Sequence, residues 1–209
     1  MLTLMATSSF ADGSSDGGQS NVLNGQVNLN SQQANLFMTA GNTAGNVSGG
    51  AAAGGNQIDI TTMNNTDVTN SQYVQAGSIA SNVQANLTNV GGTTDLSSQA
   101  VCNQASISMD PTSTNVYSNQ ECSANDPSAQ LTANITNANN DVNLASAAVS
   151  NTFEEDTNAP NGSVQNYQIN HAAVNATVTS NTANVNGNLT ATSSAIGNTG
   201  QIIHYSTGN

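Results

Sequence analysis

A pattern of about 47 residues recurs four times along this chain, and no other feature constrains the fold as strongly. It is anchored on four asparagines that stand 47, 48 and 47 residues apart, namely Asn56, Asn103, Asn151 and Asn198. A fixed period in this range is typical of arrays in which each unit buries its apolar face only against its neighbours. The sequence therefore predicts a repeat protein whose function belongs to the array rather than to a single pocket.

Three further columns keep this period. An alanine stands three residues before each asparagine, at Ala53, Ala100, Ala148 and Ala195. An aliphatic residue stands twenty before it, at Leu36, Val83, Leu131 and Val178. The residues twenty-nine before it are Val27, Val74, Cys122 and Ile169. We expect these columns to line a thin core of small and β-branched side chains.

The segment before each asparagine alternates with a period of two, which is typical of a strand with one buried face. In the third repeat the alternating residues are Val142, Leu144, Ser146 and Ala148. Turn-forming pairs precede this segment in every copy, at Gly45-Asn46, Gly91-Gly92, Asn139-Asn140 and Asn186-Gly187. Because no segment shows helical periodicity with caps, the sequence predicts an all-β fold.

A unit of this size with small side chains cannot bury a stable core alone, so the copies must stack. We predict a single β-repeat domain over residues 21–209, folded as a β-solenoid of stacked parallel strands. The repeats are 21–68, 69–115, 116–163 and 164–209. Equivalent positions of successive turns lie about 4.8 Å apart, so the four anchoring asparagines are expected to form an amide ladder. A β-sandwich assembled from repeat hairpins is the alternative fold.

The number of turns per repeat is open. One wide turn of 47 residues and two narrow turns of 23 or 24 residues both fit the period. The aliphatic column and the isoleucines at Ile60, Ile107 and Ile202 differ by 24 positions, which favours two turns. Other columns do not repeat at that distance.

The charge composition excludes whole classes of function. The chain has no lysine or arginine and twelve carboxylates, giving a net charge of -12. Nucleic-acid binding needs cations to displace the counterions of phosphates, and an anionic membrane surface would repel this chain. No apolar stretch is long enough for a membrane span, so direct membrane insertion is not expected.

The two cysteines and the N-terminus bear on the compartment. Cys102 and Cys122 bracket a turn-rich segment, and a disulfide between them would fit an oxidising, extracellular setting. Two independent buried thiols are the alternative. Residues 1–20 carry no repeat column and are expected to be a flexible lead or the remnant of a secretory signal, because Ser9-Phe10-Ala11 resembles a cleavage site.

Candidate catalytic and metal-binding groups are few. His171 and His204 have no neighbouring nucleophile and carboxylate at a recognisable spacing, so we interpret both as solvated. The acidic run Glu154-Glu155-Asp156 is interpreted as a solvated loop that discourages unwanted strand pairing. Two cysteines without matching histidines do not make a zinc site. We expect no enzyme activity, no cofactor and no metal.

The asparagine- and alanine-rich rhythm resembles that of a known group of proteins. The segments Thr192–Asn198 and Gly41–Asn46, set among Asn/Gln/Ala strands, resemble bacterial curli-like secreted proteins and, most of all, holdfast-anchor proteins that tether an adhesive to the cell. Gln75 and Gly77 begin the Gln-x-Gly-x-x-Asn order of curli repeats, and Ala80 stands where that order has asparagine. The resemblance implies secretion, a β-solenoid fold, self-assembly and a role in adhesion at the cell surface.

These observations predict an extracellular structural or adhesion protein. Its copies would join end to end through open strand edges, as fibre subunits or as an anchor for related secreted subunits. An ice- or polysaccharide-binding solenoid with a Thr/Ser/Asn face is the alternative, based on the pairs Thr177-x-Thr179 and Thr190-x-Thr192. The expected partners are the protein itself or related secreted subunits, with an extracellular polysaccharide as a further candidate.

Overall fold

The computed structural model describes residues 20–62, 65–75, 77–109, 115–123, 125–158, 162–171 and 173–205. In these ranges the chain forms twelve strands and no helix. The strands are β1 (Ser20–Asn28), β2 (Gln32–Thr43), β3 (Val47–Thr62), β4 (Thr66–Val74), β5 (Ser78–Val90), β6 (Thr94–Met109), β7 (Asn115–Cys122), β8 (Asn125–Ala138), β9 (Val142–Thr157), β10 (Ser163–Asn170), β11 (Asn175–Val185) and β12 (Leu189–His204). Residues 1–19 of the predicted lead lie outside the described residues.

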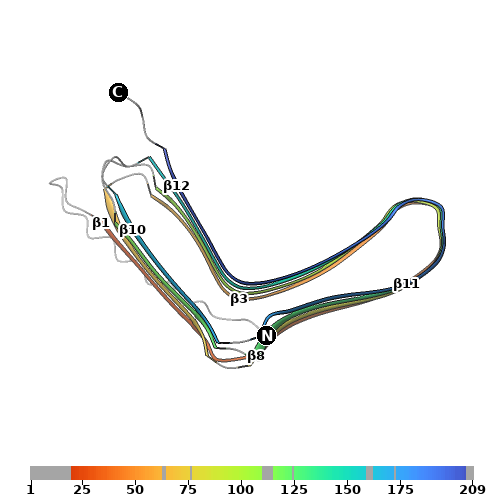
Figure 1. Ribbon diagram of the computed structural model, residues 1–209, viewed down its shortest axis with the longest axis horizontal. Helices are drawn as coiled ribbons and strands as arrows, with labels where there is room; N and C mark the ends of the chain where they lie inside the picture. The colour runs from red at the N-terminus through yellow and green to blue at the C-terminus, as the bar shows by residue number, and fades with distance from the viewer. Residues whose placement is uncertain are drawn as a thin grey trace.

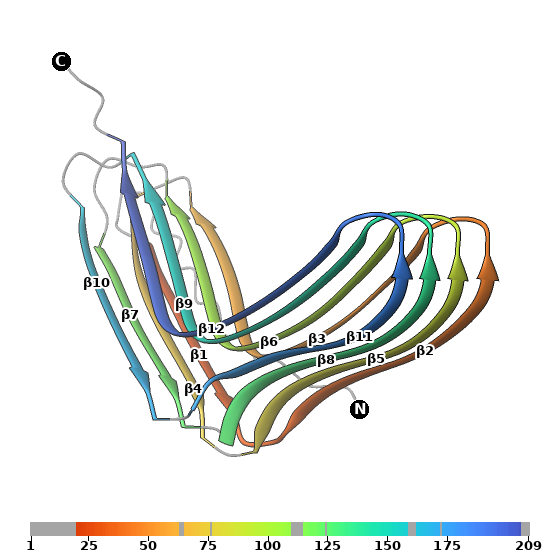
Figure 2. The same ribbon diagram turned by 45° about the vertical axis from the view of Figure 1, so that its right-hand side comes forward.

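Each repeat forms one turn of three strands, and the four turns stack into three parallel sheets (Figure 2). Sheet A has the order β1-β4-β7-β10, sheet B β11-β8-β5-β2, and sheet C β12-β9-β6-β3. All described pairings between these strands are parallel. The predicted β-solenoid is therefore confirmed, and the described strands form none of the antiparallel hairpins of the alternative sandwich.

Each repeat forms one wide turn, so the two narrow turns that the 24-residue spacing favoured are not formed by the described strands. The aliphatic column lies on sheet B, where Val83 pairs with Leu131, while the isoleucine column lies on sheet C, where Ile60 pairs with Ile107. The two columns belong to different sheets of the same turn.

In cross-section each turn is bent into two arms, because the strands of sheet C are long and change direction midway (Figure 1). In the arm at the right of Figure 1, sheet B faces the first half of sheet C. In the arm at the left, sheet A faces the second half of sheet C. We call these the B–C arm and the A–C arm.

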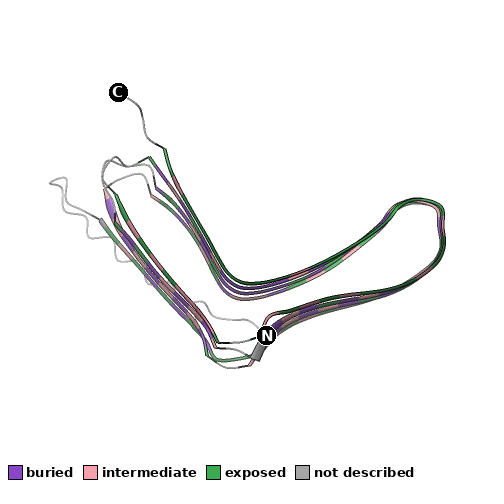
Figure 3. Cartoon of the chain, viewed as in Figure 1, coloured by how far each residue is buried: buried purple, intermediate pink, exposed green. Residues whose placement is uncertain are grey.

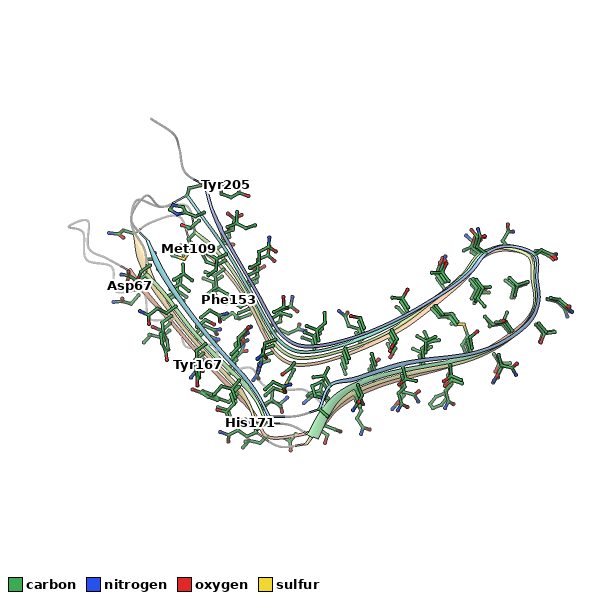
Figure 4. The ribbon with its side chains drawn as sticks, in the orientation of Figure 1. Asp67, Met109, Phe153, Tyr167, His171 and Tyr205 are labelled. Carbon is green, nitrogen blue, oxygen red and sulfur yellow. A yellow bond between two sulfur atoms is a disulfide. The ribbon has the colours of Figure 1, made fainter. Side chains whose placement is uncertain are left out.

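The core follows the two arms and the bend between them (Figure 3). The B–C arm buries an aliphatic cluster around Val83, Leu131 and Ile135. The A–C arm buries Ile107, Met109 and Phe153, and Figure 4 shows the last two pointing into the space between sheets A and C. Small residues such as Ala100, Ala148 and Cys102 fill the bend. Thin arms need small or β-branched side chains, which explains the composition.

The outer end of the B–C arm is closed by the turn residues that the sequence indicated. The connections between sheets B and C span residues 44–46, 91–93, 139–141 and 186–188. Just before them stand four asparagines with positive φ between 55° and 59°, at Asn42, Asn89, Asn137 and Asn184. Asparagine tolerates this left-handed conformation, and the four side chains also form an exposed ladder with N–O distances of 2.7 to 2.9 Å.

One predicted column is wrong at both ends of the array. In sheet A, Val74 and Cys122 pair with each other, but their partners in the terminal turns are Asn28 and Asn170. Val27 and Ile169 lie one residue earlier and point outward, and Val27 is 59% exposed. The connections between sheets A and B differ in length from turn to turn, so counting back from the anchoring asparagines loses the register there.

Candidate functional site

The four anchoring asparagines form a ladder along the solenoid axis, inside the bend. The Nδ2 atoms of Asn56, Asn103 and Asn151 donate to the Oδ1 atoms of Asn103, Asn151 and Asn198, at 3.0, 2.8 and 2.8 Å. The second N–H of each amide reaches across to sheet A, where Asn103 donates to the Glu121 carbonyl at 3.0 Å. The ladder thus ties sheet C to sheet A in every turn.

A second ladder, of glutamines, runs beside the first one in the opposite direction. The Nε2 atoms of Gln72, Gln120 and Gln168 donate to the Oε1 atoms of Gln26, Gln72 and Gln120, at 3.0, 2.8 and 2.8 Å. The second N–H of each glutamine reaches from sheet A to a carbonyl of sheet C, as in Gln120 to Thr152 at 2.9 Å. Because the two rows of amide dipoles point in opposite directions, their fields oppose each other along the axis.

Sequence reasoning missed the glutamine ladder, although its period is present. Gln26, Gln72, Gln120 and Gln168 stand 46, 48 and 48 residues apart. A search for amide columns, in addition to apolar ones, would have found them. Isolated glutamines are commonly exposed in proteins, so the repeat is the feature that identifies these four as interior residues.

A third column at the A–C arm is less complete. Asn24 Nδ2 donates to Asn70 Oδ1 at 2.7 Å, and Asn70 Nδ2 donates to Ser118 Oγ at 3.1 Å. Asn166 occupies this column in the last turn. Asn24 is 7% exposed, and its Oδ1 atom is buried without a hydrogen-bond partner in the described chain. A buried carbonyl oxygen without a donor is costly, so this oxygen marks an incomplete site at the first turn.

A disulfide joins Cys102 in β6 to Cys122 in β7. Both cysteines are fully buried at the bend. Position 102 corresponds to Gly55 in the first turn, where an added Cβ would collide with the Cys102 carbonyl and lie 2.8 Å from Val74. The bend therefore needs a small residue in the first turn and holds the disulfide between the second and third.

The acidic run is part of a strand, so its interpretation as a solvated loop is wrong. Glu155 lies in β9, where it pairs with Ile107 on one side and Ile202 on the other. Its side chain is 1% exposed, and Oε2 has no hydrogen-bond partner in the described residues. Burial raises the pKa of Glu155 to about 6; Asp156 adds to the increase and His204 opposes it. The alternation of the strand, rather than the polarity of the run, decides which carboxylate is buried.

Replacing Glu155 by glutamine should remove a pH dependence of stability. The folded-state pKa is raised from 4.5 to about 6. The stability that this group contributes is therefore present below pH 4.5 and lost as pH rises through 6, by about 2 kcal/mol. Glu155→Ile, which restores the isoleucine column, should stabilise the protein by at least that amount at pH 7. Chemical unfolding between pH 4 and pH 8 measures both effects.

The matched control is Glu154→Gln, which removes the same charge from an exposed neighbour. It should leave the slope of stability against pH between 4.5 and 6 unchanged. A Glu155→Gln protein that loses stability over this range as steeply as the parent would contradict the assignment.

Both histidines are exposed, as the sequence predicted. His171 is 60% exposed in the connection after β10, with its Nε2 atom 3.7 Å from Glu121 Oε1. An exposed pair of this kind contributes little to stability. His204 is exposed at the end of β12. In the described ranges, no three His, Cys, Asp or Glu side chains are placed to hold a metal ion.

The predicted core columns are fully buried in the middle of the stack and differ in burial between its two ends. Val83, Leu131, Ala100 and Ala148 are at most 1% exposed. In the terminal turns Leu36 and Val178 are partly buried, Ala53 in β3 is 7% exposed, and Ala195 in β12 is exposed. The alanine column therefore stays buried in the first turn and changes from core to surface in the last one.

The two ends of the described stack present unpaired strand edges. Within the described residues, no strand pairs with the outer edge of β1, β2 or β3, or with that of β10, β11 or β12. The last turn exposes large apolar residues along β12, with Leu189, Ile196 and Ile202 at 45%, 39% and 54%. An exposed strand edge lined with apolar side chains is a template for adding another strand.

The end faces also carry almost no charge. Asp59 is the one carboxylate between residues 20 and 62, and residues 163–205 contain none. The remaining charges of the described solenoid belong to its middle two turns. A chain of single-sign charge repels its own copies, so a face free of carboxylates is the place where two copies can meet at the smallest electrostatic cost.

No protein-family model, curated protein or solved structure matches this chain. None of the described residues belongs to a helix able to cross a membrane.

Proposed function

We propose that this protein is an extracellular structural protein whose copies join end to end through the strand edges of the first and last turns. The observation that carries the proposal is the combination of unpaired edges, exposed apolar residues on β12 and end faces nearly free of charge. Strand addition between copies would satisfy backbone groups and cover Ile202 in one step. In this role the protein serves as a fibre subunit or as a cell-surface anchor for related secreted subunits.

The disulfide supports the extracellular setting. Cys102 and Cys122 are bonded to each other, and stable disulfides are typical of oxidising compartments. The resemblance to curli-like and holdfast-anchor proteins is in accord with a secreted, self-associating protein. Buried amide ladders support the structural role, because they hold successive turns in register without any salt bridge to lysine or arginine.

The alternative, a solenoid that presents a regular threonine face to ice or polysaccharide, has less support. Thr177 pairs with Gln130, and Thr190 pairs with Asn143. Thr179 does pair with Thr132, but the next residue in that column is Gln84, so the threonine column ends after two turns. A flat hydroxyl array needs the same residue in successive turns. An extracellular polysaccharide stays a candidate partner of the assembled protein rather than the reason for its fold.

Replacing Ile202 by lysine should abolish association and leave the single chain folded. In one copy the ammonium group extends into solvent, because Ile202 is 54% exposed. In an end-to-end contact the ammonium group and the neighbouring Glu155 carboxylate of its own column would both be removed from water, and the desolvation of the two charges costs several kcal/mol, which their attraction repays only in part. We expect association to weaken at least 100-fold, as measured by sedimentation velocity over a range of concentrations.

Gln201→Lys is the matched control, because it adds the same charge to the neighbouring outward-facing residue of β12. This variant should associate at least as well as the parent, because Gln201 is exposed and shares its column with Glu154 and Asp59. A parent protein that stays monomeric at every concentration, with no fibres by negative-stain microscopy, would refute the proposed function.

A further inference from the structure

We infer that two copies meet head to tail in a single register, with the last turn of one copy on the first turn of the next, so that three amide columns continue through the junction. The inference rests on the proposed end-to-end association and adds the polarity and the contacts of the junction. In this arrangement β10, β11 and β12 of one copy pair in parallel with β1, β2 and β3 of the next.

The asparagine ladder has a donor end and an acceptor end. Each Nδ2 donates toward the following turn, so the Oδ1 atom of Asn56 receives no donor from an earlier rung among the described residues, while Asn198 has no later rung. Asn198 Nδ2 already donates to the Gln168 carbonyl at 3.2 Å, which leaves its other N–H for the next copy. Head-to-tail stacking places this N–H against Asn56 Oδ1 of the neighbour.

The glutamine ladder has the opposite polarity, so it imposes the same order independently. Its free donor is at the first turn, where Gln26 Nε2 uses one N–H for the Gln57 carbonyl at 3.0 Å. Its free acceptor is Oε1 of Gln168 in the last turn, whose Nε2 donates to Gln120 and to the Thr199 carbonyl. A head-to-head contact would set like ends of each ladder against each other, two donors in one ladder and two acceptors in the other.

The third column is separate from the two ladders and also has a free acceptor at the first turn, because Asn24 Nδ2 donates inward to Asn70. Asn24 Oδ1 is buried in the first turn and lacks a donor in the described chain. In the proposed junction its neighbour is Asn166 of the other copy, the residue that occupies the same column in the last turn. The Asn166 amide group is placed to donate to this oxygen. The contact thereby removes a penalty that the single copy carries.

The apolar columns match in the same register. Ile202 of one copy meets Ile60 of the next, since both occupy the column that contains Ile107. Ala195 likewise meets Ala53. A slip by one residue would turn these side chains to the opposite face, and a slip by two would set asparagine against an aliphatic residue. One register therefore satisfies amide and apolar columns together.

Engineered cysteines test the polarity and the register directly. Gln57 and Thr199 are exposed, point outward from sheet C and share a column. In the proposed junction their Cα atoms lie about 4.8 Å apart, within the range that a disulfide spans. The double variant Gln57→Cys/Thr199→Cys, assembled and then mildly oxidised, should give a ladder of covalent oligomers on a non-reducing denaturing gel.

Two controls separate this arrangement from others. Gln57→Cys/Gln201→Cys moves one cysteine two residues along β12, to about 8 Å from its target, and should remain monomeric on the gel. Thr199→Cys alone should not cross-link to itself. Peptide mapping verifies that Cys102 and Cys122 stay paired with each other.

The outcomes distinguish the inference from the proposed function. Oligomers of Gln57→Cys/Thr199→Cys alone support head-to-tail stacking in this register. The inference is overturned if the protein associates by sedimentation but this cross-link does not form. It is also overturned if Thr199→Cys cross-links to itself or if Gln57→Cys/Gln201→Cys forms oligomers. In each of these cases end-to-end association stands. No association at any concentration overturns both.

Discussion

Replacing Asn103 by alanine is expected to lower the free energy of unfolding by at least about 3 kcal/mol. Asn103 is fully buried and occupies an inner rung of the asparagine ladder. It accepts from Asn56 and donates to Asn151 Oδ1 and to the Glu121 carbonyl. Alanine leaves these three partners in the interior without their hydrogen bonds, and each unsatisfied group costs about 1 to 3 kcal/mol.

The measurement is equilibrium unfolding in denaturant or by heat. For a chain of this size a loss of 3 kcal/mol corresponds to a decrease of about 6 to 12 °C in Tm. The control is Asn134→Ala, which interrupts a ladder contact of similar geometry, 2.8 Å to Asn86 Oδ1, on the exposed face of β8. The control should change stability by no more than about 0.5 kcal/mol. Equal losses in the two variants would mean that burial does not determine what a rung contributes.

The contrast between Asn103 and Asn134 shows that interior and exposed asparagines must be told apart by something other than composition. The chain contains 35 asparagines, and composition alone does not say which ones are interior. The period identified Asn103, because the same residue type recurred at a fixed distance in all four copies. The neighbouring alternation then placed it on a strand with a buried face. The first inference rests on a comparison of the four copies, and the second rests on strand geometry, which the sequence of one repeat contains.

The width of the turn could not be predicted in the same way. Strand alternation shows which residues point inward, but it does not show how many strands separate two inward positions. Leu36 and Ile60, 24 residues apart, lie on sheets B and C of one turn rather than on successive turns. The direction of the chain at the bend depends on contacts between strands, and these come from segments far apart in the sequence.

Glu155 was misinterpreted for a related reason. Three consecutive acidic residues have the composition of a solvated loop, and the third repeat departs from the others there. However, the β9 backbone is paired on both sides, so the strand alternation continues through the acidic run. The second residue of the run therefore takes the inward position that isoleucine holds in the other turns. Pairing with neighbouring turns outweighed the desolvation of one carboxylate, which is the opposite of what side-chain polarity alone predicts.

The distribution of charge connects the fold to the proposed function. A chain without cations cannot balance its carboxylates by ion pairs to lysine or arginine, so their positions matter. The terminal turns carry amide, hydroxyl and aliphatic side chains in the columns of the inner turns, and Asp59 is the one carboxylate in their described residues. A surface that repeats the interior pattern of its own protein is complementary to another copy. This is the property that a solenoid cap normally removes.

Removing the Cys102–Cys122 disulfide is expected to lower stability by about 3 kcal/mol, because the bond closes a segment with a sequence separation of 20. The best variant is Cys102→Ser/Cys122→Val, since Ser150 and Val74 occupy the same two columns in neighbouring turns. The reduced parent and the variant should unfold at similar denaturant concentrations, and reductant should have no effect on the variant, which contains no cysteine. Hydrogen exchange should accelerate first in β7 and in the second half of β6, which the bond holds together. A variant as stable as the oxidised parent would show that packing at the bend, rather than the covalent link, holds the A–C arm closed.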